Sequence, residues 1–121
     1  MAGRFPLFTD AHIQQSIVEG LSRRGWDVER AIDVFPERTR DPVLLDYVVM
    51  SGRVFVTNDS GIIQTVNERA AAEPSIKGMV FWEELLYYEL SAGDFIRAFE
   101  DFAKEDEPFR VPIRYIGKPS K

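Results

Sequence analysis

The sequence predicts an α/β protein in which helices cover both faces of a mainly parallel sheet of about five strands. Short apolar runs alternate with segments of helical periodicity, which implies βαβ crossovers. The Val-Phe-Val run at residues 54–56 stops at the polar residues 57–59, as expected of a strand buried on both faces. No linker or repeat divides the chain, so we expect one three-layer α/β/α domain over residues 1–121, with its core at about 5–116 and a flexible tail at 117–121.

Four further segments complete the predicted sheet. An apolar run at residues 5–9 ends at Asp10, and alternating residues at 26–32 indicate a second strand near an edge. Residues 79–82 and 111–116 supply the fourth and fifth strands. The second strand can lie on one side of the first and the third on the other, so the strand order reverses between the first and third strands.

Helical periodicity marks the segments 13–24, 41–50, 62–72, 83–90 and 94–104. The pair Asp41-Pro42 predicts a helix start with Asp as N-cap and Pro at the first helical position. The helix that follows is apolar on nearly all sides as far as Met50, which indicates deep burial or an interface. Three phenylalanines of the last segment share one face, as expected of core packing: Phe95, Phe99 and Phe102.

Composition narrows the class of protein. The chain has no cysteine, which excludes disulfides, cysteine-ligated zinc and thiol nucleophiles and fits a reducing cytosol. The net charge of −5 argues mildly against nucleic-acid binding through a broad basic face, although acids that hold a cation remain compatible with it. We expect a soluble, cytoplasmic protein without membrane contact, because the start lacks a signal-peptide apolar region and the longest apolar stretch is short.

Three aspartates are predicted at the carboxyl edge of the sheet, where ligands bind in open α/β folds. Asp10 follows the first strand, Asp59 follows the third, and Asp41 begins a crossover helix. Each one alone is better explained as a helix cap than as a ligand. Together they resemble an all-oxygen site for Mg²⁺ or Mn²⁺.

Five motifs recur in an order that resembles a known family: residues 8–13 (FTDAHI), 25–28 (GWDV), 41–45 (DPVLL), 52–59 (GRVFVTND) and 78–82 (GMVFW). This series is similar to the small prokaryotic PIN-like domains, relatives of the VapC-type toxin ribonucleases. The resemblance extends over roughly residues 5–116. It implies a Mg²⁺- or Mn²⁺-dependent nuclease, often acting on RNA, and in many relatives a toxin paired with an antitoxin protein.

The resemblance also implies roles for single residues. Asp10, Asp41 and Asp59 match the acidic catalytic and metal-binding positions, and Thr57 matches a threonine near the last of them. Related sequences often carry a glutamate where this chain has Ala11, and a further aspartate where it has Gly61. Glu83, which follows the fourth strand at the same edge, is the candidate replacement ligand.

Four other polar residues are candidates for substrate binding. His12 could orient a phosphate or water, or could be a surface group at the start of a helix. Arg38 and Arg40 could clamp phosphates, or could solvate a loop and pair with Glu37 or Asp41. Asn58 could reach the substrate or satisfy the turn.

Two function classes stay open at this point. The first is an endoribonuclease in which a metal ion polarises the scissile phosphate and activates a water molecule. The second is a catalytically weakened relative that binds a partner or nucleic acid. A signalling receiver domain is set aside, since the fourth and fifth strands lack its terminal hydroxyl residue and lysine. We also expect a homodimer formed through the apolar helices, unless these helices only cover the sheet.

Overall fold

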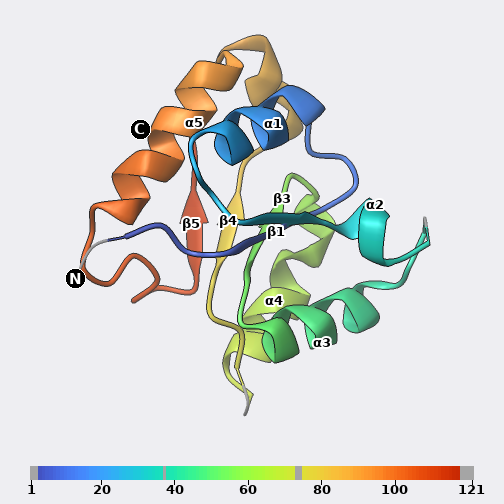
Figure 1. Cartoon of the computed structure of the whole chain (residues 1–121). Coiled ribbons are helices and arrows are strands. Elements are labelled where there is room, and N and C mark those ends of the chain that lie inside the picture. The colour runs from blue at the N-terminus through green and yellow to red at the C-terminus, as the bar shows by residue number, and fades with distance from the viewer. Residues whose placement is uncertain (1–2, 37, 73–74, 118–121) are drawn as a thin grey trace.

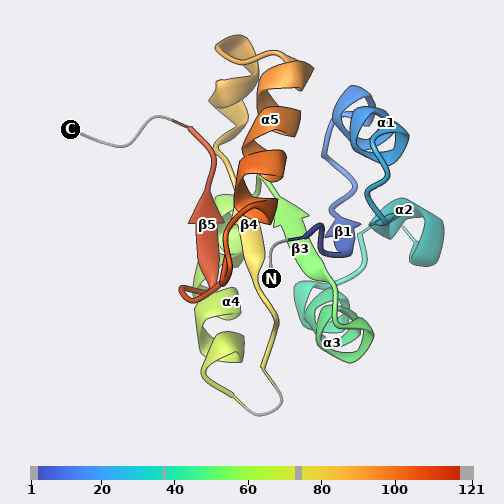
Figure 2. The ribbon, with the colours of Figure 1, turned by 60° about the vertical axis from the view of Figure 1, so that its left-hand side comes forward.

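The computed structural model describes residues 3–36, 38–72 and 75–117 and has a five-stranded sheet between two layers of helices (Figures 1 and 2). The strands are β1 (Leu7–Thr9), β2 (Val28–Arg30), β3 (Val54–Thr57), β4 (Met79–Phe81) and β5 (Ile113–Tyr115). Their order is β2-β1-β3-β4-β5, and every pair is parallel. The predicted fold class is therefore confirmed, as is the reversal of strand order between β1 and β3.

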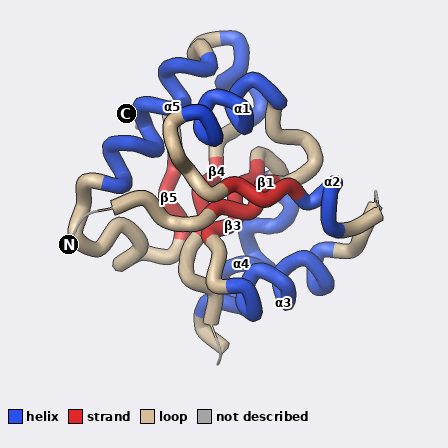
Figure 3. Tube along the Cα trace, in the orientation of Figure 1, coloured by secondary structure: helices blue, strands red, loops and turns tan. Residues whose placement is uncertain are grey.

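Within the described residues, five α-helices and two 3₁₀ segments connect the strands (Figure 3). The α-helices are α1 (Gln15–Arg23), α2 (Ala31–Val34), α3 (Asp41–Ser51), α4 (Ile63–Ala70) and α5 (Ala92–Ala103), and the 3₁₀ segments are η1 (Ser60–Ile62) and η2 (Glu84–Tyr88). Helices α1 and α5 lie on one face of the sheet, and α3 and α4 lie on the other (Figure 1).

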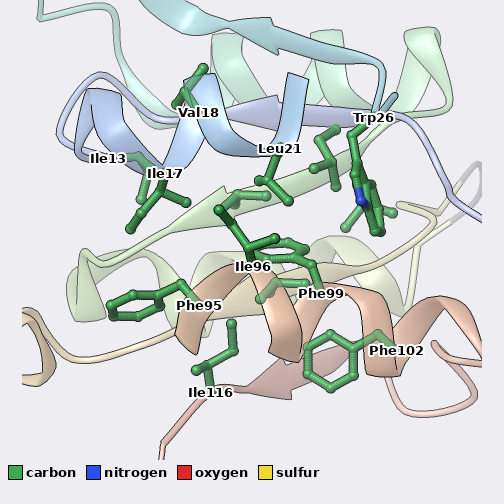
Figure 4. Packing of buried hydrophobic residues seen from close by; sticks show 14 of the residues in the cluster. Ile13, Ile17, Val18, Leu21, Trp26, Phe95, Ile96, Phe99, Phe102 and Ile116 are labelled. Carbon is green, nitrogen blue, oxygen red and sulfur yellow. The ribbon is translucent and has the colours of Figure 1, made fainter. Parts of the chain in front are cut away.

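Successive side chains along each strand point to opposite faces of the sheet, so the interior has two hydrophobic cores, one on each face. Leu7 and Val54 contribute to the core beneath α1 and α5, whereas their neighbours Phe8 and Phe55 contribute to the core beneath α3 and α4. All four residues of β3 are buried, which confirms the interpretation of this run as a central strand. In the first core, side chains of α1 face the phenylalanine stripe of α5 (Figure 4). That stripe therefore serves core packing, as predicted.

Several element boundaries differ from the sequence prediction. The second strand covers only residues 28–30 of the predicted 26–32, because residues 31 and 32 belong to the short helix α2. The segment predicted as a helix over residues 83–90 contains the 3₁₀ turns of η2 instead of an α-helix. Asp41 is the first residue of α3, and Arg40 occupies the N-cap position without a side-chain cap hydrogen bond. The predicted N-cap role of Asp41 is therefore wrong by one residue.

Helix α3 carries apolar side chains on its solvent side as well as its buried side. Leu45 and Val48 lie in the core, but 46% of the surface of Val43 and 85% of that of Met50 are exposed. Gly52 ends the helix in the left-handed conformation, with φ of 69°, which glycine adopts without steric cost. No helix in the described ranges has the length and hydrophobicity needed to cross a membrane. The predicted tail lies outside the described residues, apart from Gly117.

Candidate active site

The three predicted aspartates line one cavity of about 150 Å³ at the carboxyl edge of the sheet. Asp10 directly follows β1, Asp59 follows β3 by two residues, and Asp41 enters from the start of α3. The fold brings them together because β1 and β3 are adjacent parallel strands whose ends meet where the strand order reverses. The remaining wall comes from Ala11, His12, Ala31, Ile32, Phe35, Pro36, Arg38, Thr39 and Leu44.

The hydroxyl group of Thr57 connects two of these aspartates from beneath. It donates a hydrogen bond to Oδ2 of Asp10 at 2.8 Å and accepts one from the backbone N–H of Asp59 at 3.1 Å. The other carboxylate oxygen of Asp10 accepts a bond from the N–H of Ala11 at 2.6 Å. Thr57 itself is fully buried. The carboxylate of Asp10 is therefore oriented from both of its oxygens.

Asp10 does not begin a helix, contrary to the sequence prediction. Residues 10–14 form a loop, and α1 begins only at Gln15. Asp59, by contrast, does cap a helix, since its Oδ1 accepts a bond from the N–H of Gly61 at 2.9 Å at the start of η1. A Cβ atom at residue 61 would lie 3.2 Å from that oxygen, so the small residue lets the turn close against the carboxylate.

Asp41 is the aspartate whose ionisation the site opposes. Partial burial raises the pKa of the Asp41 carboxyl group, and the negative charges of Asp59 and Asp10 raise it further. This mutual repulsion shows that the three carboxylates act on one another electrostatically. A bound cation would relieve the repulsion.

The geometry does not form a ready-made set of direct metal ligands. Among residues 3–36, 38–72 and 75–117, no group of three or more histidine, cysteine, aspartate or glutamate side chains is placed to hold a metal ion. The donor chemistry nevertheless fits Mg²⁺ or Mn²⁺, which use carboxylates and usually retain several waters. The volume of about 150 Å³ also has room for a partly hydrated ion, given about 30 Å³ for each water.

Glu83, the candidate replacement ligand, faces a different cavity. A larger hollow of about 560 Å³ adjoins the acidic one and shares its residues Asp59 and His12. Glu83, Glu84 and Leu85 line the larger hollow, whereas Asp10 and Asp41 do not. Glu83 is thus grouped with Asp59 but not with the other two aspartates, and its role as a ligand stays a prediction.

The predicted substrate-binding residues are distributed over both cavities. His12 is exposed and lines both of them. Arg38 lines the acidic cavity and has a φ of 67°, a conformation rare for residues other than glycine. Arg40 lines neither cavity, and the suggested partner Glu37 lies outside the described residues. Asn58 lines the larger cavity, and its amide group donates a hydrogen bond to the hydroxyl of Tyr87 at 3.2 Å.

Sequence reasoning missed two contributors to this region. The first is α2 with Phe35, which contributes apolar residues to the cavity wall although residues 31 and 32 were predicted to belong to the second strand. The second is Tyr87, which lies in the segment 83–90 that the sequence predicts only as a helix. No local sequence pattern predicts either contribution, because both depend on how segments that are distant in the sequence pack together.

Comparison with known proteins identifies a family that this chain resembles over most of its length. The family described as "PIN like domain" matches residues 6–84, which is more than half of the chain and includes all three aspartates. No curated protein and no solved structure gives a match. With the match and the all-parallel order of the sheet in agreement, the chain belongs to the PIN-like domain family.

Proposed function

We propose that the protein is a divalent-metal-dependent nuclease, specifically an endoribonuclease of the toxin–antitoxin type. The observation that carries this proposal is the convergence of Asp10, Asp41 and Asp59 on one cavity, with Asp41 held in its protonated form more strongly than a free aspartate. PIN-like domains typically bind divalent metals, which agrees with a site built from carboxylates. Mg²⁺ or Mn²⁺ is the expected cofactor.

The three aspartates would hold the ion together with retained waters. When bound, the ion supplies Lewis-acid polarisation of the phosphate and neutralises negative charge. Thr57 and the N–H of Ala11 fix the direction of the Asp10 carboxylate, so that it needs little reorganisation on binding. Asp59 is fixed in the same way by the N–H of Gly61.

The same residues suggest how a phosphodiester would be hydrolysed. A water oxygen attacks phosphorus, the bond to the leaving ribose oxygen breaks, and the attacking water loses its proton. Asp41 enters the cavity from the start of α3, away from the Thr57 bridge between the other two aspartates, and is assigned as the proton acceptor. Arg38 at the cavity wall would supply positive charge toward the phosphate, and His12, which lines both cavities, is assigned as the proton donor to the leaving oxygen.

The alternative is a catalytically weakened module that binds a partner or nucleic acid. Two observations favour it: Ala11 and Gly61 replace acids that related sequences often carry, and the described residues contain no ready-made metal-ligand group. The 560 Å³ hollow beside Asp59 would then be the binding surface. RNA is the expected ligand of the nuclease, and an antitoxin protein is its expected regulator in the cytoplasm, whereas the binding module would take a partner protein or a nucleic acid.

The two functions are separated by a cleavage assay on a fluorophore-labelled single-stranded RNA of random sequence. We expect the protein to cut this RNA in the presence of Mn²⁺ or Mg²⁺ and to stop when EDTA is added. Retardation of the RNA in a gel without cleavage, at any concentration of either metal, would support the binding module and contradict the nuclease.

We further propose that the chain forms a two-fold dimer through α3. The exposed Val43 and Met50 are apolar side chains without cover on this helix, and two-fold dimers are the commonest closed assembly. The phenylalanines of α5 are buried in the core and take no part. Light scattering at micromolar concentration should give the mass of two chains, and Met50→Lys should give the mass of one. A single-chain mass that is unchanged on tenfold concentration would contradict the dimer.

A further inference from the structure

The hydroxyl group of Tyr87 lies between the two loops that carry Asp10 and Asp59. It accepts a hydrogen bond from the side-chain amide of Asn58 at 3.2 Å and another from the backbone N–H of Gln14 at 3.4 Å. Asn58 directly precedes Asp59 in the chain. Gln14 closes the loop that begins at Asp10 and is the N-cap residue of α1. One oxygen atom thus joins both loops.

The ring of Tyr87 is held by the core and not by the loops. It contacts Trp82 with ring centres 6.2 Å apart and Phe95 with ring centres 5.5 Å apart. Both of these neighbours are almost completely buried. The position of the hydroxyl oxygen is therefore set by η2, by Trp82 just after β4 and by Phe95 of α5, so it can act as a fixed point for the two loops.

Tyr87 lines neither the acidic cavity nor the larger hollow beside it. It also lies beyond residues 6–84, the part of the chain that matches the PIN-like family. The role that these contacts support is therefore one of positioning, and it is not assigned by membership of the family.

We propose that Tyr87 is a positioning residue that fixes the loops of Asp10 and Asp59 relative to each other through its hydroxyl group. Thr57 makes the inner connection between these aspartates, and Tyr87 makes the outer one. The inference rests on the proposed nuclease function for its effect on catalysis. Removal of the hydroxyl leaves the amide of Asn58 and the N–H of Gln14 to water, and the carboxylates lose part of their preorganisation.

The test compares Tyr87→Phe with Tyr88→Phe. The first variant keeps the packed ring and loses only the hydroxyl, while Tyr88 is 87% exposed and serves as the matched control. On the random-sequence RNA with Mn²⁺, we expect Tyr87→Phe to lower kcat about fivefold with little change in KM, since a net hydrogen bond of about 1 kcal/mol corresponds to that factor. Tyr88→Phe should match the wild type in both constants. An unchanged kcat in Tyr87→Phe would overturn the inference.

Asn58→Ala shows whether the effect passes through the observed contact. If it does, the fall in kcat caused by Tyr87→Phe becomes smaller in the Asn58→Ala background, as a double-mutant cycle measures. Equal effects of Tyr87→Phe in both backgrounds would contradict coupling through Asn58.

Amide hydrogen exchange, read by mass spectrometry, separates failure of this inference from failure of the proposed function. Tyr87→Phe should speed exchange in residues 10–14 and 57–61 while exchange in the β3 core stays as in the wild type. A wild-type protein that does not cleave RNA would refute the nuclease but leave this readout intact. Exchange in both loops identical to that of the wild type and of Tyr88→Phe would overturn the positioning role in either case.

Discussion

Asp59→Asn is expected to lower the rate of RNA cleavage at least about 100-fold. Residues that merely orient metal ligands cost 10- to 100-fold when they are replaced, so loss of a ligand charge should reach at least the upper end of that range. The backbone geometry should survive, because an asparagine oxygen can accept the same hydrogen bond from the N–H of Gly61. Steady-state cleavage of the labelled RNA, together with urea unfolding, measures both quantities.

Asp46→Asn is the matched control for this experiment. Asp46 lies on α3 near the site in sequence, but its carboxylate is exposed and forms an ion pair with Arg69 at 3.2 Å. We expect the control to keep full activity. If Asp59→Asn lost more than about 2 kcal/mol of unfolding free energy, the upper end for losing a helix cap, the role of Asp59 would be structural rather than catalytic.

Asp41→Asn is expected to stabilise the metal-free protein at pH 7. The pKa of Asp41 is raised in the folded state, so the folded chain holds this proton more tightly than the unfolded chain, in which the pKa is about 3.9. Stability contributed by this group therefore falls as the pH rises from about 3.9 through the raised pKa, and the ionised group is unfavourable above it. Asparagine removes that penalty.

The gain should be present at pH 7 and should shrink as the pH approaches 4. Urea unfolding at a series of pH values in the presence of EDTA measures it. The same variant should lose RNA cleavage, because it removes the proposed proton acceptor. A variant that is less stable than the wild type at pH 7 would show that Asp41 makes a favourable interaction as an anion.

Much of the fold follows from local patterns in the sequence. The fully apolar run of β3 could only be a central strand, and the alternation of strands and helices required parallel pairing. The boundaries of the helices and strands are harder to predict from the sequence, because they depend on tertiary contacts. The residues after β2 turn into α2, and residues 84–88 adopt 3₁₀ geometry with Tyr87 packed between Trp82 and Phe95. Periodicity alone does not distinguish these outcomes.

The sequence predicts which residues form the candidate site better than it predicts how their side chains are arranged. Strand ends in a parallel sheet share one edge, so the proximity of Asp10 and Asp59 follows from strand order. The bridging hydroxyl of Thr57, the separate cavity of Glu83 and the hydrogen bonds to Tyr87 depend on side-chain directions that spacing does not encode. The raised pKa of Asp41 likewise depends on burial as well as on its neighbours.

Isothermal titration calorimetry with Mn²⁺ tests the central claim, that the three carboxylates form a metal site, most directly. We expect the wild type to bind with a dissociation constant on the order of 0.1 to 1 mM, since few protein ligands replace the waters of the ion. Asp46→Asn should bind equally well, and Asp10→Asn and Asp59→Asn should show no binding heat. Absence of heat in the wild type, or equal heat in all three variants, would contradict a metal site at this edge of the sheet.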